Sequence, residues 1–65
     1  MDRTIVRVRP TDGEWQIEAN GARLKNVRER GEAIARAREF AHMHHGICLI
    51  EYRYGRSLER EDYEG

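Results

Sequence analysis

Two turn signals divide the first 27 residues into three segments of β-type sequence. The segments 4–9, 14–19 and 22–27 each alternate apolar and polar residues, which is the pattern of a half-buried strand. Residues 10–13 (Pro-Thr-Asp-Gly) separate the first two segments, and Asn20-Gly21 separates the last two. Asn-Gly is a strong hairpin signal because a two-residue type I′ turn needs positive φ at both positions. The sequence therefore predicts a three-stranded antiparallel meander.

The two turns also predict the register of the strands. A four-residue loop at 10–13 pairs Val8 with Trp15 and Val6 with Ile17. A two-residue turn at 20–21 pairs Ile17 with Leu24. Both hairpins then place the apolar side chains on one face, an agreement that a slip of one residue would destroy. The members of that face are Thr4, Val6, Val8, Trp15, Ile17, Ala19, Ala22 and Leu24.

Apolar residues at three- and four-residue spacing predict one helix after the meander. The helix begins near Glu29 or Gly31 and ends at His45, with Gly46 as its C-terminal stop. The run 47–52 then predicts a buried strand. A right-handed crossover through the helix brings this strand beside the first one. The apolar helix face comprises Ala33, Ile34, Ala37, Phe40, Ala41 and His44.

This order of elements predicts an α+β fold, with the meander, one helix packed on the sheet, and a closing strand or hairpin. In the hairpin alternative, a turn at 54–55 leads into a short fifth strand near 57–59. One domain spans residues 1–59, and we expect the acidic segment 60–65 to fray. A chain of 65 residues builds only a thin core, so association with a partner would add stability.

Composition excludes several protein classes. Cys48 is the single cysteine, so no disulfide forms within the chain and a reducing compartment is expected. The first residues contain no apolar run of the signal-peptide type, and no segment has the length of a membrane span. We therefore expect a cytoplasmic protein with no membrane association. Twelve basic residues balance twelve acidic ones.

The second face of the predicted meander is polar. The register places five basic residues on this face: Arg3, Arg7, Arg9, Arg23 and Lys25. Glu14, Gln16, Glu18 and Ile5 share that face. A mildly basic sheet can contact phosphates, and the alternative is a solvated face with cross-strand ion pairs. The face carries no aromatic residue, which disfavours binding by base stacking.

No constellation of catalytic or cofactor-binding residues is found. Cys48 lies in an apolar run, typical of an inert core thiol. His42, His44 and His45 precede it at spacings that do not match a zinc motif, so we expect no metal and no other cofactor. The acidic residues near the end of the chain lack a rigid scaffold for acid–base chemistry. We expect no enzyme activity.

Three motifs occur in a recognisable order. They are Gly13-x-Trp15-x-Ile17, then Glu32-Ala33-Ile34-x-x-Ala37-x-x-x-Ala41, then Gly55-Arg56. In this order the chain resembles, over residues 7–58, a family of short bacterial proteins known only as a domain of unknown function. It departs from the family pattern at Arg7, where a His is usual, at Tyr54, where an Asp is usual, and at Ser57-Leu58. The resemblance implies a β-β-β-α-β fold and a bacterial or phage origin, and it brings no activity or ligand.

Two hypotheses for function follow. The first is a small non-catalytic binding module that contacts nucleic acid through Arg3, Arg7, Arg9, Arg23 and Lys25. The alternative is a module for protein interaction or self-association as a homodimer, with a phage-type accessory or inhibitor protein as a special case. Ile5, Tyr52 and Tyr54, together with Tyr63, are the candidate anchors of such an interface.

Overall fold

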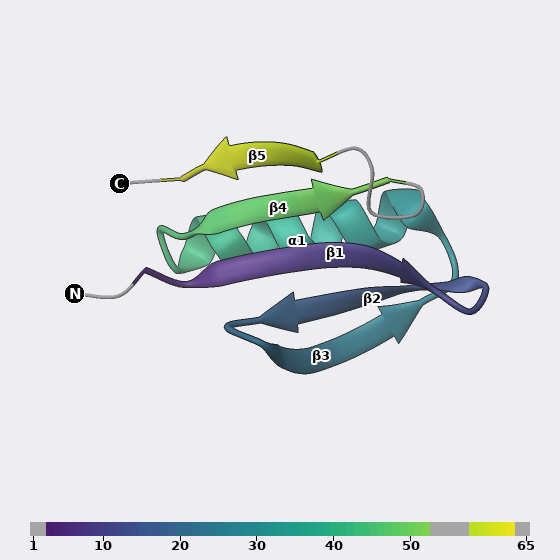
Figure 1. Cartoon of the computed structure of the whole chain (residues 1–65). Coiled ribbons are helices and arrows are strands. Elements are labelled where there is room, and N and C mark those ends of the chain that lie inside the picture. Colours follow the sequence, from purple (N-terminus) through teal and green to yellow (C-terminus); the bar gives the residue numbers. More distant parts are fainter. Residues whose placement is uncertain (1–2, 53–57, 64–65) are drawn as a thin grey trace.

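The computed structural model describes residues 3–52 and 58–63 and shows one five-stranded sheet with a helix on one face (Figure 1). The strands lie in the order β3-β2-β1-β4-β5. β1 and β4 are parallel, and all other neighbours are antiparallel. The α+β prediction is confirmed, including the strand beside the first one and the fifth strand. The elements are β1 (Ile5–Thr11), β2 (Glu14–Ala19), β3 (Ala22–Val27), α1 (Arg30–Met43), β4 (Ile47–Glu51) and β5 (Leu58–Asp62).

The first hairpin is tighter than predicted. Its turn consists of Asp12 and Gly13 alone, with φ of 38° and 80°, and Val8 pairs with Ile17 instead of Trp15. The predicted four-residue loop was therefore wrong, but a shift of two residues keeps the same side chains on the same face. Proline has no backbone N–H, yet Pro10 lies inside β1. This is tolerated because β4 pairs with β1 only as far as Val8, so no carbonyl group of β4 needs a donor at position 10.

The second hairpin has the predicted Asn20-Gly21 turn, with φ of 51° and 87°, but a β-bulge follows it. The register shifts between Ile17 and Glu18, so Lys25 pairs with Ile17 where Leu24 was predicted. Leu24 is the extra residue and remains 47% exposed. Without the bulge, the alternation would turn the buried Val27 toward solvent. The bulge thus shifts the alternation of side chains along β3 by one residue, so that Val27 points into the core.

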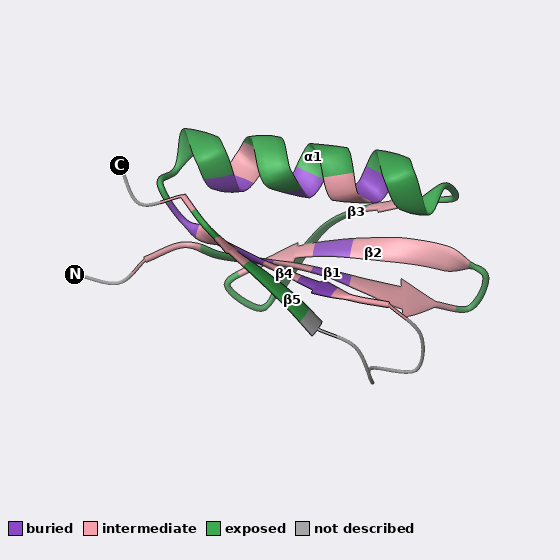
Figure 2. Ribbon diagram, turned by 90° about the horizontal axis from the view of Figure 1, so that it is seen from above, coloured by how far each residue is buried: buried purple, intermediate pink, exposed green. Residues whose placement is uncertain are grey.

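Small residues let α1 lie close to the sheet. Ala33, Ala37 and Ala41 recur every four residues on one side of the helix and are fully buried (Figure 2). They pack on six buried sheet residues: Val6, Val8, Ile17, Val27, Cys48 and Ile50. Full burial of one such aliphatic side chain stabilises the fold by about 1.5–3 kcal/mol. The helix–sheet layer is therefore thin and closely packed.

The helix ends at Met43, two residues before the predicted His45. His45, and not Gly46, adopts the left-handed region, with φ of 52°. Gly46 N–H donates to the Ala41 carbonyl at 2.7 Å. Gly46 is required for a different reason, because a Cβ at this position would lie 2.3 Å from the carbonyl oxygen of Thr4. The chain therefore passes from α1 into β4 in contact with the backbone that precedes β1.

The last strand is held by side chains from distant parts of the chain. Arg38 on α1 donates to both carboxylate oxygens of Glu61, with a shortest distance of 2.7 Å, and Tyr63 Oη donates to the same carboxylate. The hydrogen bond from Arg38 lowers the pKa of Glu61, against a smaller opposing effect of desolvation. Arg3 donates to Asp62 at 2.6 Å. Residues 60–62, predicted to fray, therefore belong to β5.

The described residues contain one helix, α1, and it is neither long nor apolar enough to cross a membrane.

Candidate functional site

The two faces of the sheet differ in what covers them. α1 lies on one face, and no element in the described ranges lies on the other (Figure 2). We call this second face the open face. Alternation along the strands assigns its members, because Val6, Val8, Cys48 and Ile50 point toward the helix. The open face comprises Arg23 and Asn26 from β3, Glu14, Gln16 and Glu18 from β2, Ile5, Arg7 and Arg9 from β1, Ile47, Leu49 and Glu51 from β4, and Arg60 and Asp62 from β5.

Three aliphatic side chains lie together on the open face, over the neighbouring strands β1 and β4. Ile5 pairs directly with Ile47 across the parallel β1–β4 ladder, and Leu49 follows Ile47 by two residues on the same face. Ile5 is 41% exposed, and the other two are partly buried. We call Ile5, Ile47 and Leu49 the apolar strip. The strip extends from the first residues of β1 and β4 toward the middle of the face, where Leu49 lies beside Arg7.

Charged side chains of both signs surround the apolar strip. Arg7 Nε lies 3.8 Å from Glu51, and Arg9 Nη1 lies 3.6 Å from Glu18. Gln16 donates to the Glu18 carboxylate, and Asn26 donates to Glu14. These partly exposed pairs each contribute about 0–1 kcal/mol to stability, so they leave the side chains available for other partners. The face is therefore mixed in sign.

The structure separates the five residues of the predicted basic surface. Arg7 and Arg9 lie on the open face, and Arg23 lies there on the edge strand β3, opposite Glu18. Lys25 does not, because the bulge pairs it with the buried Ile17 and turns it to the helix side. Arg3 lies at the margin, where it bonds Asp62 and the carbonyl oxygens of His45 and Gly46. The placement of Lys25 is a correction to the sequence prediction.

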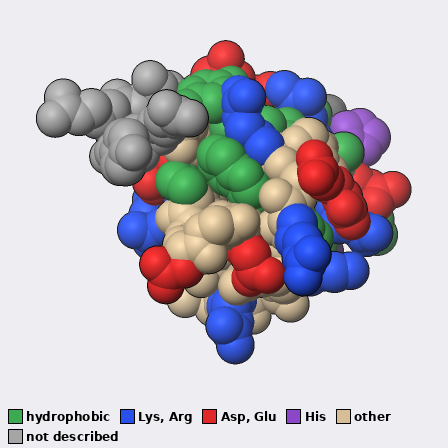
Figure 3. Space-filling model, turned by 90° about the vertical axis from the view of Figure 1, so that its right-hand side faces the viewer, with side chains coloured by type: hydrophobic (Ala, Val, Ile, Leu, Met, Phe, Trp, Pro, Cys, Tyr) green, Lys and Arg blue, Asp and Glu red, His purple; other side chains and the backbone are tan. Residues whose placement is uncertain are grey.

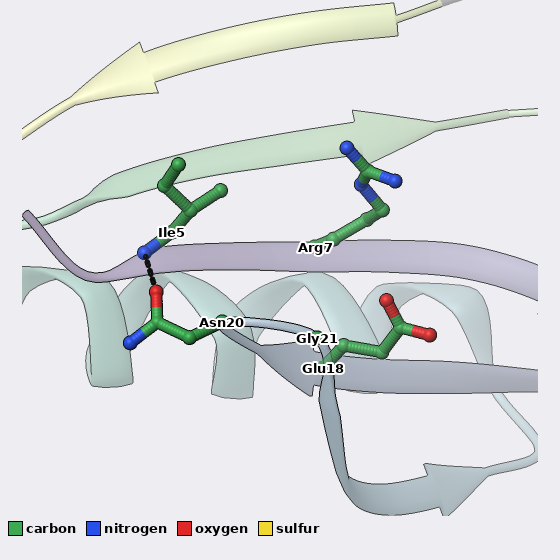
Figure 4. A pocket seen from close by; sticks show the side chains of 5 residues that line it. All are labelled: Ile5, Arg7, Glu18, Asn20 and Gly21. Carbon is green, nitrogen blue, oxygen red and sulfur yellow. Dashed lines mark hydrogen bonds between the residues drawn. The ribbon is translucent and has the colours of Figure 1, made fainter.

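A shallow hollow of about 240 Å³ opens on this face beside the second turn (Figure 4). Ile5, Arg7, Glu18, Asn20 and Gly21 line it. Asn20 Oδ1 accepts a hydrogen bond from the Ile5 N–H at 2.9 Å, and the Asn20 N–H donates to the Ile5 carbonyl. The turn residue thus fixes the start of β1 and the position of Ile5. The tendency of Asn side chains to bond nearby backbone in turns was the signal for this contact.

The aromatic candidates for an interface have partners within the chain. The Arg30 guanidinium lies 4.1 Å from the centre of the Tyr52 ring and 6.0 Å from that of Trp15. Tyr52 and Tyr63 pack against the core, and Tyr54 lies outside the described residues. Figure 3 views the end of the molecule that lies to the right in Figure 1, where hydrophobic side chains lie among groups of both charges. Of the predicted anchors, Ile5 is therefore the one placed on the open face.

A second apolar region lies on the helix side, between β3 and α1. This groove of about 350 Å³ has Ile17 at its base and Leu24, Phe40 and Met43 along its sides. Met43 is 69% exposed. Lys25 also lines the groove, as a consequence of the bulge. The groove is separated from the open face by the thickness of the sheet.

Cys48 and the histidines, which were considered as a reactive thiol and as metal ligands, do not lie on the open face. Cys48 is fully buried. Desolvation, followed by the charge of Glu61, raises the pKa of its thiol to about 11. His44 stacks on Phe40 with ring centres 4.4 Å apart, and His42 meets Tyr63 edge-on at 5.7 Å. Within residues 3–52 and 58–63, no three His, Cys, Asp or Glu side chains are grouped to hold a metal ion.

The comparisons with known proteins assign a family. No curated protein and no solved structure matches the chain. One family model matches residues 6–63 and is described as an uncharacterized protein conserved in bacteria (DUF2188). This match covers the helix and all the described strands except Ile5, the first residue of β1. The chain belongs to this bacterial family of unknown function.

Proposed function

We propose that the chain is a non-catalytic protein-interaction module that binds through the open face of its sheet. The observation that supports this most directly is the apolar strip of Ile5, Ile47 and Leu49 on a face that α1 does not cover. Apolar side chains bordered by polar and charged groups are the usual anatomy of a protein interface. The β1–β4 ladder holds the strip rigidly.

The nucleic-acid hypothesis has less support from the geometry. Its surface needed five basic residues on one face, but Lys25 lies on the helix side. Arg3, Arg7 and Arg9 each lie within 4.0 Å of a carboxylate. Binding to phosphates requires clustered positive charge, whereas here carboxylates are interleaved with the guanidinium groups. The net charge of zero adds no general attraction to a polyanion.

Site-specific photo-crosslinking in bacterial cells tests this function. A photoreactive amino acid replaces Leu49 at the centre of the open face, and in a control chain it replaces Ala35 on the exposed side of α1. We expect discrete protein adducts from position 49 and none from position 35. Adducts that disappear on nuclease treatment would establish nucleic acid as the ligand. Equal labelling from both positions, or none from position 49, would contradict the proposal.

A further inference from the structure

The open face is self-complementary about an axis parallel to its strands. We infer that its partner is a second copy of this chain, packed face to face around a two-fold axis that runs between β1 and β4. This inference rests on the proposed function, because it uses the same surface. A two-fold contact requires that each residue and its counterpart be mutually compatible. The register of the sheet allows that condition to be checked residue by residue.

The residues of the apolar strip are compatible with their counterparts across the two-fold axis. A two-fold axis between β1 and β4 stacks each β1 on the β4 of the second copy. Ile5 and Ile47 occupy the same row of the sheet, so Ile5 of one copy lies over Ile47 of the other, twice. Leu49 lies one row further, beside Arg7. The aliphatic stem of Arg7 then covers Leu49 of the second copy. Sheets packed in this way lie about 10 Å apart, a separation that such side chains fill.

The charged side chains around the apolar strip are also compatible with their counterparts across the two-fold axis. Arg9 and Glu51 are the next residues of β1 and β4 after the last observed pair, Val8–Ile50, so the continued register assigns them to one row. The axis therefore places Arg9 over Glu51 of the second copy. The same operation stacks β2 on β5, and Glu18 and Arg60 share the row of Arg7 and Leu49. Two pairs of opposite charge thus form on each side of the axis.

The size of the face sets the expected affinity. The strands β2, β1, β4 and β5 make a surface of about 19 Å by about 17 Å, from ~4.8 Å per strand and ~3.4 Å per residue. Two such faces have a combined area of about 650 Å², below the roughly 1,200 Å² of a standard interface and in the range of weak, transient contacts. We therefore expect a weak, reversible dimer with a dissociation constant on the order of 100 μM. The zero net charge of the chain removes long-range repulsion between copies.

A charge-reversal pair gives the sharpest test. Arg9→Glu and Glu51→Arg each place like charges over one another twice in a two-fold dimer, so each variant alone should be at least tenfold weaker in self-association. An equimolar mixture should recover a heterodimer. In that mixture the new carboxylate of one chain faces the new guanidinium of the other, and the remaining native pair is intact. Arg36→Glu on the outer side of α1 is a control with the same charge change.

Sedimentation velocity and light scattering over a concentration series provide the readout, with circular dichroism to confirm folding of each variant. We expect the wild type to approach twice the 7.7 kDa mass of the chain. Leu49→Arg should give a monomer, because the new guanidinium lies over Arg7 of the second copy, whereas Leu24→Arg, in the groove on the helix side, should still dimerise. The reverse ranking would transfer the interface to the groove and overturn the inference.

The remaining outcomes separate this inference from the proposed function. A wild-type chain that stays monomeric at millimolar concentration, or a mixture of folded variants that fails to associate, would refute the two-fold dimer. The proposed function would survive either result if crosslinks from position 49 reach other proteins. It would fail together with the dimer if position 49 yields no protein adduct.

Discussion

Gly46→Ala should destabilise the protein strongly, although it adds a single methyl group. The new Cβ would lie 2.3 Å from the Thr4 carbonyl oxygen and 3.2 Å from the Thr4 Cβ. Ordinary contacts begin near 3.4 Å, so the backbone would have to separate by about 1 Å. Two hydrogen bonds depend on this approach: Ile47 N–H to the Thr4 carbonyl at 2.9 Å, and Gly46 N–H to the Ala41 carbonyl at 2.7 Å.

The magnitude follows from those contacts. Each backbone hydrogen bond contributes about 1 kcal/mol net, and residual strain adds to their loss, so the free energy of unfolding should fall by about 2–3 kcal/mol. In a domain of this size, 1 kcal/mol corresponds to about 4–8 °C in Tm. Thermal unfolding followed by circular dichroism should therefore show a decrease of roughly 10–20 °C.

Gly31→Ala is the matched control. Gly31 lies in the first turn of α1, and a Cβ there meets nothing within 4 Å. Replacing glycine with alanine inside a helix stabilises by about 0.5–1 kcal/mol, so the Tm of this variant should rise. A Gly46→Ala protein that melts within about 2 °C of the wild type would refute the close packing of the α1–β4 junction against Thr4.

Three further predictions concern the pH dependence of stability and the register of β3. The pKa of Glu61 is lower in the folded protein than in the unfolded chain. The ionised carboxylate therefore stabilises the fold at pH values above the unfolded-state pKa, and this stabilisation is lost as the pH falls through the folded-state pKa. Glu61→Gln should accordingly flatten the acid limb of Tm against pH, and an unchanged limb would contradict the Arg38 contact. The pKa of Cys48 is raised from 9.0 to about 11, so its contribution should be lost as the pH rises through that interval. Cys48→Ala should therefore lose less stability at alkaline pH than the wild type. At pH 8 a thiol reagent should react with wild-type Cys48 only at the rate at which the folded protein opens to expose it. Val27→Ala should cost about 2 kcal/mol and Leu24→Ala less than about 1 kcal/mol in urea denaturation; the opposite order would indicate a regular register without the bulge.

Local patterns predicted the parts of the fold that local sequence controls. The Asn20-Gly21 turn specifies its own conformation, and alternation assigned Val6, Val8 and Ile17 to the covered face. The length of the first loop was missed because Pro10 was treated as a strand breaker. That reasoning fails where the neighbouring strand has already ended.

The bulge and the last strand were missed for different reasons. Apolar residues at positions 22, 24 and 27 break the two-residue period, and that break was the available signal for the bulge. No equivalent signal exists for β5. Its charged residues are held by Arg38 and Arg3, which lie 23 and 59 positions away. Contacts at such separations leave no local pattern in a single sequence.

The open face was predicted in outline and not in composition. Alternation placed Arg7, Arg9 and Glu18 there, as observed. The carboxylate of Glu51 and the side chains of Ile47 and Leu49 come from β4, which the apolar run 47–52 predicted only as a buried strand. Continuous apolar runs of this kind are usual in parallel strands that are covered on both faces, but among the described residues only α1 covers β4, on the side of Cys48 and Ile50. The apolar strip therefore became visible only with the tertiary structure.

The central position of β1 affects how the chain acquires its structure. β1 is the first strand in sequence, yet its second neighbour is β4, which follows the helix. During synthesis, the meander of β1, β2 and β3 is complete while one edge of β1 still presents unpaired backbone groups. That edge stays available to other chains until the 24 residues from the end of β3 at Val27 to the end of β4 at Glu51 have been added. The time needed to synthesise this segment is long relative to the microseconds in which a hairpin forms. The meander without β4 is therefore the folding stage at which this protein is most exposed to aggregation and to chaperones.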